Sequence, residues 1–132
     1  IVNLSSVFGI IAPAGQVAYS ASKFAVRGFS EALRNELADT SVGVTVVHPG
    51  GIATKIAENA RPAEALSAAT VEEEVKTSRQ LLVLPPEKAG EIIVNGIQNR
   101  KKRVLVGNDA KVISIIARLF PDSYMKVMDR LF

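Results

Sequence analysis

Residues 42–51 read Val-Gly-Val-Thr-Val-Val-His-Pro-Gly-Gly, and this stretch decides the fold. Val42 to Val47 form a β-branched, nearly continuous apolar run, which is typical of a strand buried on both faces of a parallel sheet. The run ends at His48-Pro49, where proline and the glycines that follow turn the chain. The stretch therefore predicts a buried parallel strand that stops at a turn.

Two further apolar runs predict strands on either side of this one. Ile1 to Leu4 is followed by two serines and a loop rich in glycine and proline, which predicts a buried strand that runs into a loop. Residues 104–106 read Val-Leu-Val and end at a glycine, which predicts a third strand.

The longest predicted helix covers residues 17–38. Small side chains recur along it at steps of three and four, and bulky apolar side chains lie on the adjoining faces. A helix that is apolar over so much of its circumference is expected to be buried on several sides, with a sheet on one side and a partner helix on the other. The small residues are Ala18, Ala21, Ala25, Gly28 and Ala32.

The remaining segments complete an alternating pattern. Residues 55–69 predict a mobile loop or irregular helix, and a capping box at 70–73 predicts a short helix. Further helices are expected from Pro85 onward, over 109–120 and over 122–131. Alternation of strands and helices predicts an α/β fold with a parallel sheet and helices on its faces, in which ligands bind beyond the carboxyl ends of the strands.

Composition limits the classes of function. The 132 residues fit a single domain, with no cysteine and one histidine, so we expect no disulfide and no metal site. No signal peptide and no membrane span is predicted, and the lack of cysteine fits a cytoplasmic protein. Apolar residues make up 48% of the chain, so we expect some faces to pack against another copy or against a segment outside this sequence.

Charge is distributed unevenly along the chain. Residues 1–99 carry a net charge of −2, whereas residues 100–132 carry +5. Such asymmetry can mark contact with nucleic acid or a membrane. We favour a solvated basic tail, expect no nucleic-acid partner, and keep membrane-surface contact of the apolar, basic segment 109–132 as the less favoured alternative.

Tyr19 and Lys23 are the first candidates for chemistry. They lie four residues apart at the start of the long helix, so they share one face. A tyrosine is a poor acid–base catalyst at neutral pH, but a cation held beside it favours the phenolate. By itself this spacing also arises on any amphipathic helix. Ser6 lies at the end of the first strand and could hold a substrate carbonyl oxygen. A serine there could equally form hydrogen bonds with loop backbone groups. His48 is interpreted as structural.

Three motifs together resemble the short-chain dehydrogenase/reductase family. They are Asn3-Leu-Ser-Ser6 with Gly9 after it, Tyr19-Ser-Ala-Ser-Lys23, and His48-Pro-Gly-Gly-Ile-Ala-Thr54, in the family's order and spacing. The resemblance extends from Ile1 to about Thr54, and more loosely to Gly107. It implies the C-terminal half of a Rossmann-like, doubly wound parallel sheet, with residues 108–132 as an added helical extension of two helices.

The resemblance also implies site roles. Ser6 would polarise a carbonyl, Tyr19 would be the general acid or base, and Lys23 would bind the nicotinamide ribose and favour the phenolate. The loop would hold the nicotinamide carboxamide, and the residues implied in it are Pro49, Gly50, Ile52 and Thr54. Residues 55–80 fall where the family places its variable substrate loop.

Parts of the family pattern do not occur in this sequence. They are the glycine-rich turn that holds the pyrophosphate, the residue that selects between NAD and NADP, and the upstream asparagine of the catalytic tetrad. We therefore expect this chain to hold the reaction half of a site without the adenosine half, with the missing elements before Ile1.

These inferences predict a cytoplasmic, homo-oligomeric oxidoreductase that uses NAD or NADP to interconvert an alcohol and a carbonyl, with a mild preference for a lipophilic substrate. The alternative is a truncated, non-catalytic remnant or an oligomeric interaction module that cannot bind dinucleotide on its own.

Overall fold

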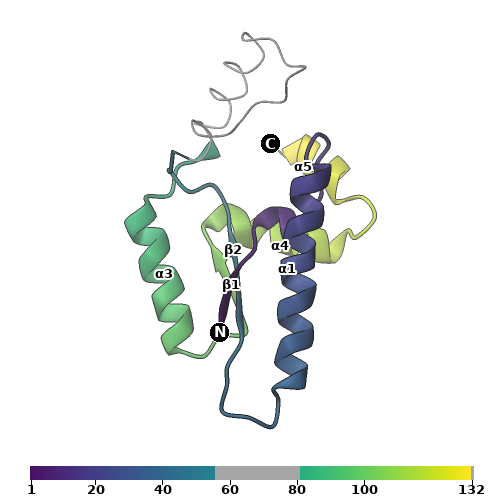
Figure 1. The fold of residues 1–132 in the computed structure, drawn as a ribbon. Coiled ribbons are helices and arrows are strands. Elements are labelled where there is room, and N and C mark those ends of the chain that lie inside the picture. Colours follow the sequence, from purple (N-terminus) through teal and green to yellow (C-terminus); the bar gives the residue numbers. More distant parts are fainter. Residues whose placement is uncertain (56–80, 132) are drawn as a thin grey trace.

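The computed structural model describes residues 1–55 and 81–131. Helices lie on both sides of a small sheet, and two more helices follow the last strand (Figure 1). Apart from Lys55, the predictions of a loop or irregular helix over 55–69, of a short helix from 70–73 and of a substrate loop over 55–80 lie outside the described residues. The elements are β1 (Val2–Leu4), a short 3-10 helix η1 (Val7–Gly9), α1 (Val17–Glu36), β2 (Thr45–Pro49), α3 (Pro86–Gln98), β3 (Arg103–Val106), α4 (Asn108–Leu119) and α5 (Tyr124–Leu131).

The three strands form one parallel sheet in the order β1-β2-β3, which confirms the predicted α/β class. Asn3 pairs with Val46, so their side chains share one face, and the Asn3 amide donates to Ser30 of α1. Val47 points to the opposite face, where it packs with Ala89 of α3. The two helices therefore cover opposite faces of the sheet.

The boundaries of β2 differ from the prediction of 42–47. The strand begins at Thr45, because its first ladder partner is Val2 and β1 has no residue earlier in the ladder. It continues to Pro49, because Pro49 still pairs with Val106 of β3. The neighbouring strands thus set both ends of β2.

The prediction that the first strand is buried is wrong for the described residues. Val2 is 40% exposed and Leu4 is 57% exposed, whereas Val46 is only 1% exposed. The reason is position, since among the described strands β1 lies at an edge of the sheet and β2 lies in the middle.

Helix α1 matches the predicted range, but within residues 1–55 and 81–131 it is buried on one side only, not on several sides as predicted. All five small residues of its stripe are exposed, and Phe29 beside them is 61% exposed. The buried positions are Ser20 and Ser30, which face the rest of the described chain. The partner helix expected on the small-residue face is not present among the residues that the structure describes.

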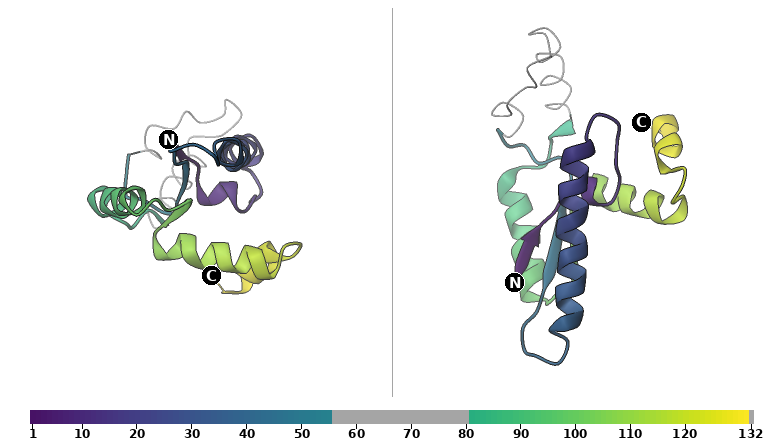
Figure 2. Two further views of the ribbon diagram at one scale, coloured as in Figure 1. Left: turned by 90° about the horizontal axis from the view of Figure 1, so that it is seen from below. Right: turned by 45° about the vertical axis from the view of Figure 1, so that its right-hand side comes forward.

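The other helices lie where the sequence predicts them. In α3, Ala89 and Gly96 are buried, and Gly96 lies against Val104 so closely that a side chain there would collide with it. Helices α4 and α5 lie near the start of α1 (Figure 2), and Ile116 and Met128 form a buried cluster with two isoleucines that follow η1. Within 1–55 and 81–131, no helix combines the length and apolarity needed to cross a bilayer.

Candidate functional site

The predicted site residues gather around the carboxyl ends of β1 and β2. Ser6 follows β1 directly, and Pro49 ends β2 on the neighbouring strand. Because parallel strands end at the same edge of a sheet, the two segments lie side by side. Helix η1 then returns the chain toward α1, which carries Tyr19 and Lys23.

Hydrogen bonds to the neighbouring elements fix the end of β1. The backbone N–H of Ser5 donates to the Val47 carbonyl at 2.8 Å, and the Ser5 hydroxyl donates to the Lys23 carbonyl at 2.8 Å. Gly9 makes this approach feasible, since a Cβ there would lie 2.8 Å from the Lys23 carbonyl oxygen and would collide with the Ser5 hydroxyl. Helix η1, which follows Ser6, therefore packs tightly against α1 at Lys23.

Ser6 is nearly buried and already has a structural contact. Its hydroxyl oxygen accepts a hydrogen bond from the Phe8 N–H at 3.2 Å, so it caps η1, as the alternative interpretation of this serine expected. A hydroxyl has two acceptor sites and one donor. The cap uses one acceptor site and leaves the O–H able to donate to another oxygen.

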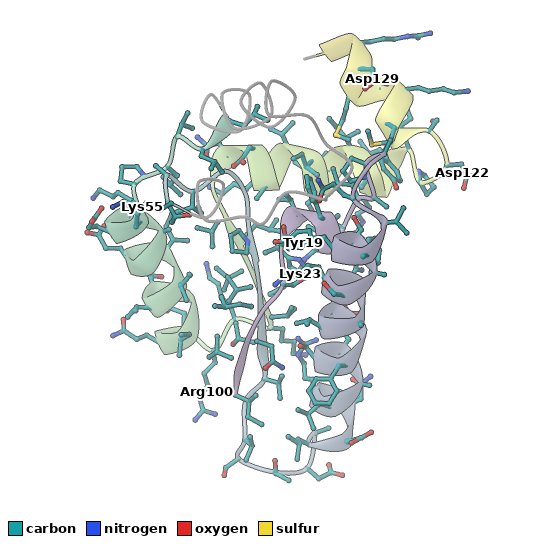
Figure 3. All side chains as sticks on the ribbon, turned by 45° about the horizontal axis from the view of Figure 1, so that its top comes forward. Tyr19, Lys23, Lys55, Arg100, Asp122 and Asp129 are labelled. Atoms are coloured by element: carbon teal, nitrogen blue, oxygen red, sulfur yellow. The ribbon has the colours of Figure 1, made fainter. Side chains whose placement is uncertain are left out.

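Tyr19 and Lys23 lie together on one face of α1, and their side chains are close in Figure 3. The Lys23 ammonium nitrogen is 5.5 Å from the centroid of the Tyr19 ring, within the range of a cation–π contact. The same nitrogen lies 3.4 Å from the Leu4 carbonyl of β1. The ring meets Phe8 edge to face at 6.0 Å, and Tyr19 stays 40% exposed. The Lys23 ammonium and the accessible Tyr19 phenol thus lie near Leu4, which directly precedes Ser5 and Ser6.

His48 contacts the predicted site, a contact that sequence reasoning missed. Its ring is fully buried, and Nδ1 lies 2.8 Å from the Ser6 carbonyl oxygen. Burial is the main reason that the pKa of His48 falls from 6.5 to about 4. The hydrogen bond to Ser6 opposes this fall, whereas the positive charges of Arg103 and Arg27 lower the pKa further. The ring is therefore neutral at physiological pH.

The loop after β2 is held from two sides. The Gly50 N–H donates to the Val106 carbonyl at 2.9 Å, and the Gly51 N–H donates to the Asp109 carboxylate at 2.6 Å. The carboxylate also fills the space beside Gly50, where a Cβ would collide with it. Sequence reasoning missed Asp109, although an acidic residue in the first turn of the last long helix was a visible signal for binding an N–H group.

The backbone donors of residues 52–54 differ in their partners within the described ranges. The N–H of Ala53 donates to the Leu84 carbonyl and that of Thr54 donates to the Ile52 carbonyl, both at 2.8 Å. The Ile52 N–H has no backbone acceptor in the described part of the chain, and the Thr54 side chain is exposed. A backbone N–H and a nearby hydroxyl are groups of the kind that can bind a carboxamide.

Within the described ranges, no three histidine, aspartate or glutamate side chains come together as metal ligands would. The arrangement can instead move a proton at Tyr19, place a cation beside it, and present a hydroxyl from Ser6.

Comparisons with known proteins point to one family. The family model described as short chain dehydrogenase matches residues 1–65. The chain is 48% identical to SadH of Mycobacterium tuberculosis, which is named as an oxidoreductase. The match runs over 130 residues and covers 97% of this chain and 46% of SadH. It is 30% identical to Dehydrogenase/reductase SDR family member 7B of Xenopus laevis, over 97% of this chain and 38% of the relative.

Two solved structures share the fold. A short chain dehydrogenase/reductase from Burkholderia phymatum, solved in complex with NAD, superposes with a TM-score of 0.74 at 24% identity and covers 89% of this chain and 46% of that one. A short-chain dehydrogenase from Streptomyces avermitilis gives 0.67 at 27% identity, covering 98% and 49%. The chain spans about half the length or less of the relatives it matches.

Proposed function

Because the chain belongs to the short-chain dehydrogenase/reductase family of oxidoreductases, we propose that it interconverts an alcohol and a carbonyl with a nicotinamide dinucleotide. The observation that carries this proposal is the placement of the Lys23 ammonium 5.5 Å from the Tyr19 ring, beside the strand end that bears Ser6. A phenol, a cation and a hydroxyl at the carboxyl edge of a parallel sheet suit proton transfer at a substrate oxygen.

Each of the three side chains has a distinct role in this proposal. In the direction of reduction, Tyr19 donates a proton to the carbonyl oxygen as it gains charge. The Ser6 O–H donates a hydrogen bond to the same oxygen and orients it. The ammonium of Lys23 stabilises the negative charge that the proton transfer leaves on the Tyr19 oxygen. It would also bind the ribose hydroxyls near the nicotinamide.

The nicotinamide, when bound, supplies or accepts the hydride. The loop of Pro49, Gly50, Ile52 and Thr54 would hold its carboxamide, and the Ile52 N–H, which has no backbone acceptor among residues 1–55 and 81–131, supports this assignment. A neighbour with NAD bound supports a nicotinamide dinucleotide as the cofactor.

Three further features belong to the proposal. An apolar substrate is supported by Phe8, whose ring lies against Tyr19. A homo-oligomer is supported by the exposed small and aromatic residues along α1, because exposed apolar patches commonly mark interfaces. A cytoplasmic location is supported by the absence of cysteine from the sequence.

Tyr19→Phe tests the proposal in the natural polypeptide that contains this sequence. Loss of the proton donor should lower turnover of the alcohol or carbonyl by about 10²–10⁴-fold. The affinity for NADH or NADPH, measured by fluorescence titration, should stay within a factor of about three, because the hydroxyl is a minor part of dinucleotide binding.

Tyr124→Phe is the matched control, because Tyr124 is the other tyrosine of the chain and its hydroxyl accepts a bond from the Ala12 N–H, away from Tyr19. It should leave turnover nearly unchanged. Near-normal turnover of the Tyr19→Phe enzyme would contradict the assignment of Tyr19.

A non-catalytic interaction module is the second candidate. The uncovered apolar side chains of β1 and of the α1 stripe favour it, because they suit association better than catalysis. Oligomer formation with no detectable binding of NADH or NADPH would support this candidate against the enzyme.

A further inference from the structure

We propose that His48 is a positioning residue that sets the orientation of Ser6 for the reaction. The inference rests on the oxidoreductase function proposed above and extends it to a residue outside the predicted catalytic set. It is carried by one contact, in which the buried imidazole of β2 reaches across to the backbone carbonyl of the serine that follows β1.

The direction of that bond follows from the chemistry of its partner. A carbonyl oxygen only accepts hydrogen bonds, so the His48 Nδ1 must carry the proton and donate it. A neutral ring protonated at Nδ1 then leaves Nε2 as an acceptor. Nε2 is buried and has no partner among the described residues.

The surroundings keep the ring in this neutral state. Burial disfavours the imidazolium, and the positive charges of Arg103 and Arg27 disfavour it as well. Two nitrogen atoms of Arg103, Nε and Nη2, are also buried without a partner in the described residues. Since these groups can only donate, they favour a neighbouring ring whose free nitrogen accepts.

The Ser6 carbonyl is shared between two donors with different effects. The Gly9 N–H donates to it at 3.0 Å and closes the turn of η1, whereas His48 ties the same oxygen to the middle of the sheet. The Ser6 backbone is extended, with φ −164° and ψ 170°. Fixing the carbonyl restricts the ψ angle of Ser6 and thereby the position of its Cβ, and the bond from the Phe8 N–H then orients the hydroxyl on that Cβ.

The other anchors of this segment stop one residue earlier. The bonds to the Val47 and Lys23 carbonyls both come from Ser5. The Ser6 hydroxyl itself is held only by the Phe8 N–H, a longer contact of 3.2 Å within the same turn. His48 is thus the one side chain, within the described residues, that connects Ser6 to the sheet.

Two substitutions separate a positioning role from simple filling of the core. The amide nitrogen of His48→Asn can occupy the place of Nδ1 and donate to Ser6, whereas that of His48→Gln reaches the place of Nε2. In the natural polypeptide that contains this chain, His48→Asn should keep kcat within about threefold of wild type. His48→Gln should lower kcat by about 10-fold or more with little change in the KM of the dinucleotide, since an interaction made in the transition state is lost.

A double-mutant cycle shows whether the effect passes through Ser6. Ser6→Ala should lower kcat, and adding His48→Gln to Ser6→Ala should lower it by less than about twofold more. If His48→Gln lowered kcat by the same factor with or without Ser6, or if the Asn and Gln variants were equally impaired, the inference would be overturned.

A spectroscopic readout on the unmutated protein covers the case in which His48→Gln does not fold. His48 is the only histidine in this sequence, so its ring nitrogens can be identified by ¹⁵N NMR through loss of the signal in His48→Asn. We expect the tautomer protonated at Nδ1, and a ring protonated at Nε2 would refute the proposed bond.

Turnover separates the failure of this inference from the failure of the proposed function. A wild type that turns over no alcohol with either dinucleotide would overturn both. An active wild type whose His48→Asn and His48→Gln variants are equally impaired would overturn this inference alone.

Discussion

The two faces of α1 are the reverse of an ordinary amphipathic helix. The inner face is polar: Ser30 is fully buried, its hydroxyl donates to the Val26 carbonyl at 2.6 Å and accepts from Asn3 at 3.0 Å. Arg34 on the same side donates to the Val44 carbonyl at 3.0 Å. The outer face carries the small-residue stripe and Phe29, and it is exposed.

This difference shows how the candidate site is held. The inner face binds the ends of neighbouring segments through their backbone carbonyls, and Lys23 belongs to that set through its contact with Leu4. Hydrogen bonds of this kind specify direction, which apolar packing does not. The outer face has the composition of an interface, and no other part of the described chain covers it.

The largest expected effect comes from replacing the buried serine. Ser30→Leu should lower the free energy of unfolding by about 2–5 kcal/mol, because the site has no room for the larger side chain and Asn3 loses its partner. At a protein concentration low enough to keep the chain monomeric, Ala32→Leu, two residues away on the exposed stripe, should change it by less than about 0.5 kcal/mol. Urea unfolding measures both, and equal effects would show that the two faces are not different.

The burial of His48 between α1 and the sheet predicts a pH dependence of stability. With a pKa of about 4 in the folded state and 6.5 when unfolded, His48 takes up a proton more readily when the chain is unfolded. Its contribution is therefore fully present above pH 6.5 and is lost as the pH falls from 6.5 to 4, by about 3 kcal/mol.

Comparison with His48→Asn isolates this contribution from the carboxylates that titrate in the same range. The stability advantage of wild type over His48→Asn should shrink by about 3 kcal/mol between pH 7 and pH 4. A difference that stays constant over this range would mean that the ring is not held neutral between α1 and the sheet. The groups from α1 and β3 that act on it are Arg27, Glu31 and Arg103.

A smaller loss is expected where η1 meets the inner face. Gly9→Ala should destabilise the chain by about 1–3 kcal/mol, since its Cβ would press on the Lys23 carbonyl and the Ser5 hydroxyl. The same change should reduce turnover, because it moves the segment that bears Ser6. Denaturation and kinetics on one variant test both statements.

The smallest effect has the opposite sign. A Cβ at Gly28 on the outer face meets nothing within 4 Å, and glycine inside a helix is unfavourable. Gly28→Ala should therefore raise the free energy of unfolding by about 0.5–1 kcal/mol. Destabilisation that grows with protein concentration would indicate that another copy of the chain covers the stripe.

The elements of the fold could be predicted because their signals are local. The β-branched run before His48 and the apolar period of residues 86–98 needed no information from elsewhere in the chain. The orientation of α1 could not be predicted in this way. An apolar stripe marks a face that some partner covers, and the sequence does not say whether that partner is the sheet.

The contacts around the candidate site depend on topology. His48 lies 42 residues from Ser6, and Asp109 lies 58 residues from Gly51. Only the parallel order of the strands brings these pairs together, so no spacing in the sequence reveals them. The roles of Ser6, Tyr19 and Lys23 rest on motif and geometry together and remain predictions until turnover is measured.

The most direct test of the central claim follows the hydride itself. A carbonyl substrate is reduced with NADH or NADPH deuterated at the nicotinamide carbon that gives up the hydride, and the alcohol product is weighed by mass spectrometry. We expect one deuterium in the alcohol with the wild type and almost no product with Tyr19→Phe. Alcohol formed without deuterium, or no alcohol from any carbonyl tested with either dinucleotide, would contradict the assignment of this chain as a nicotinamide-dependent oxidoreductase.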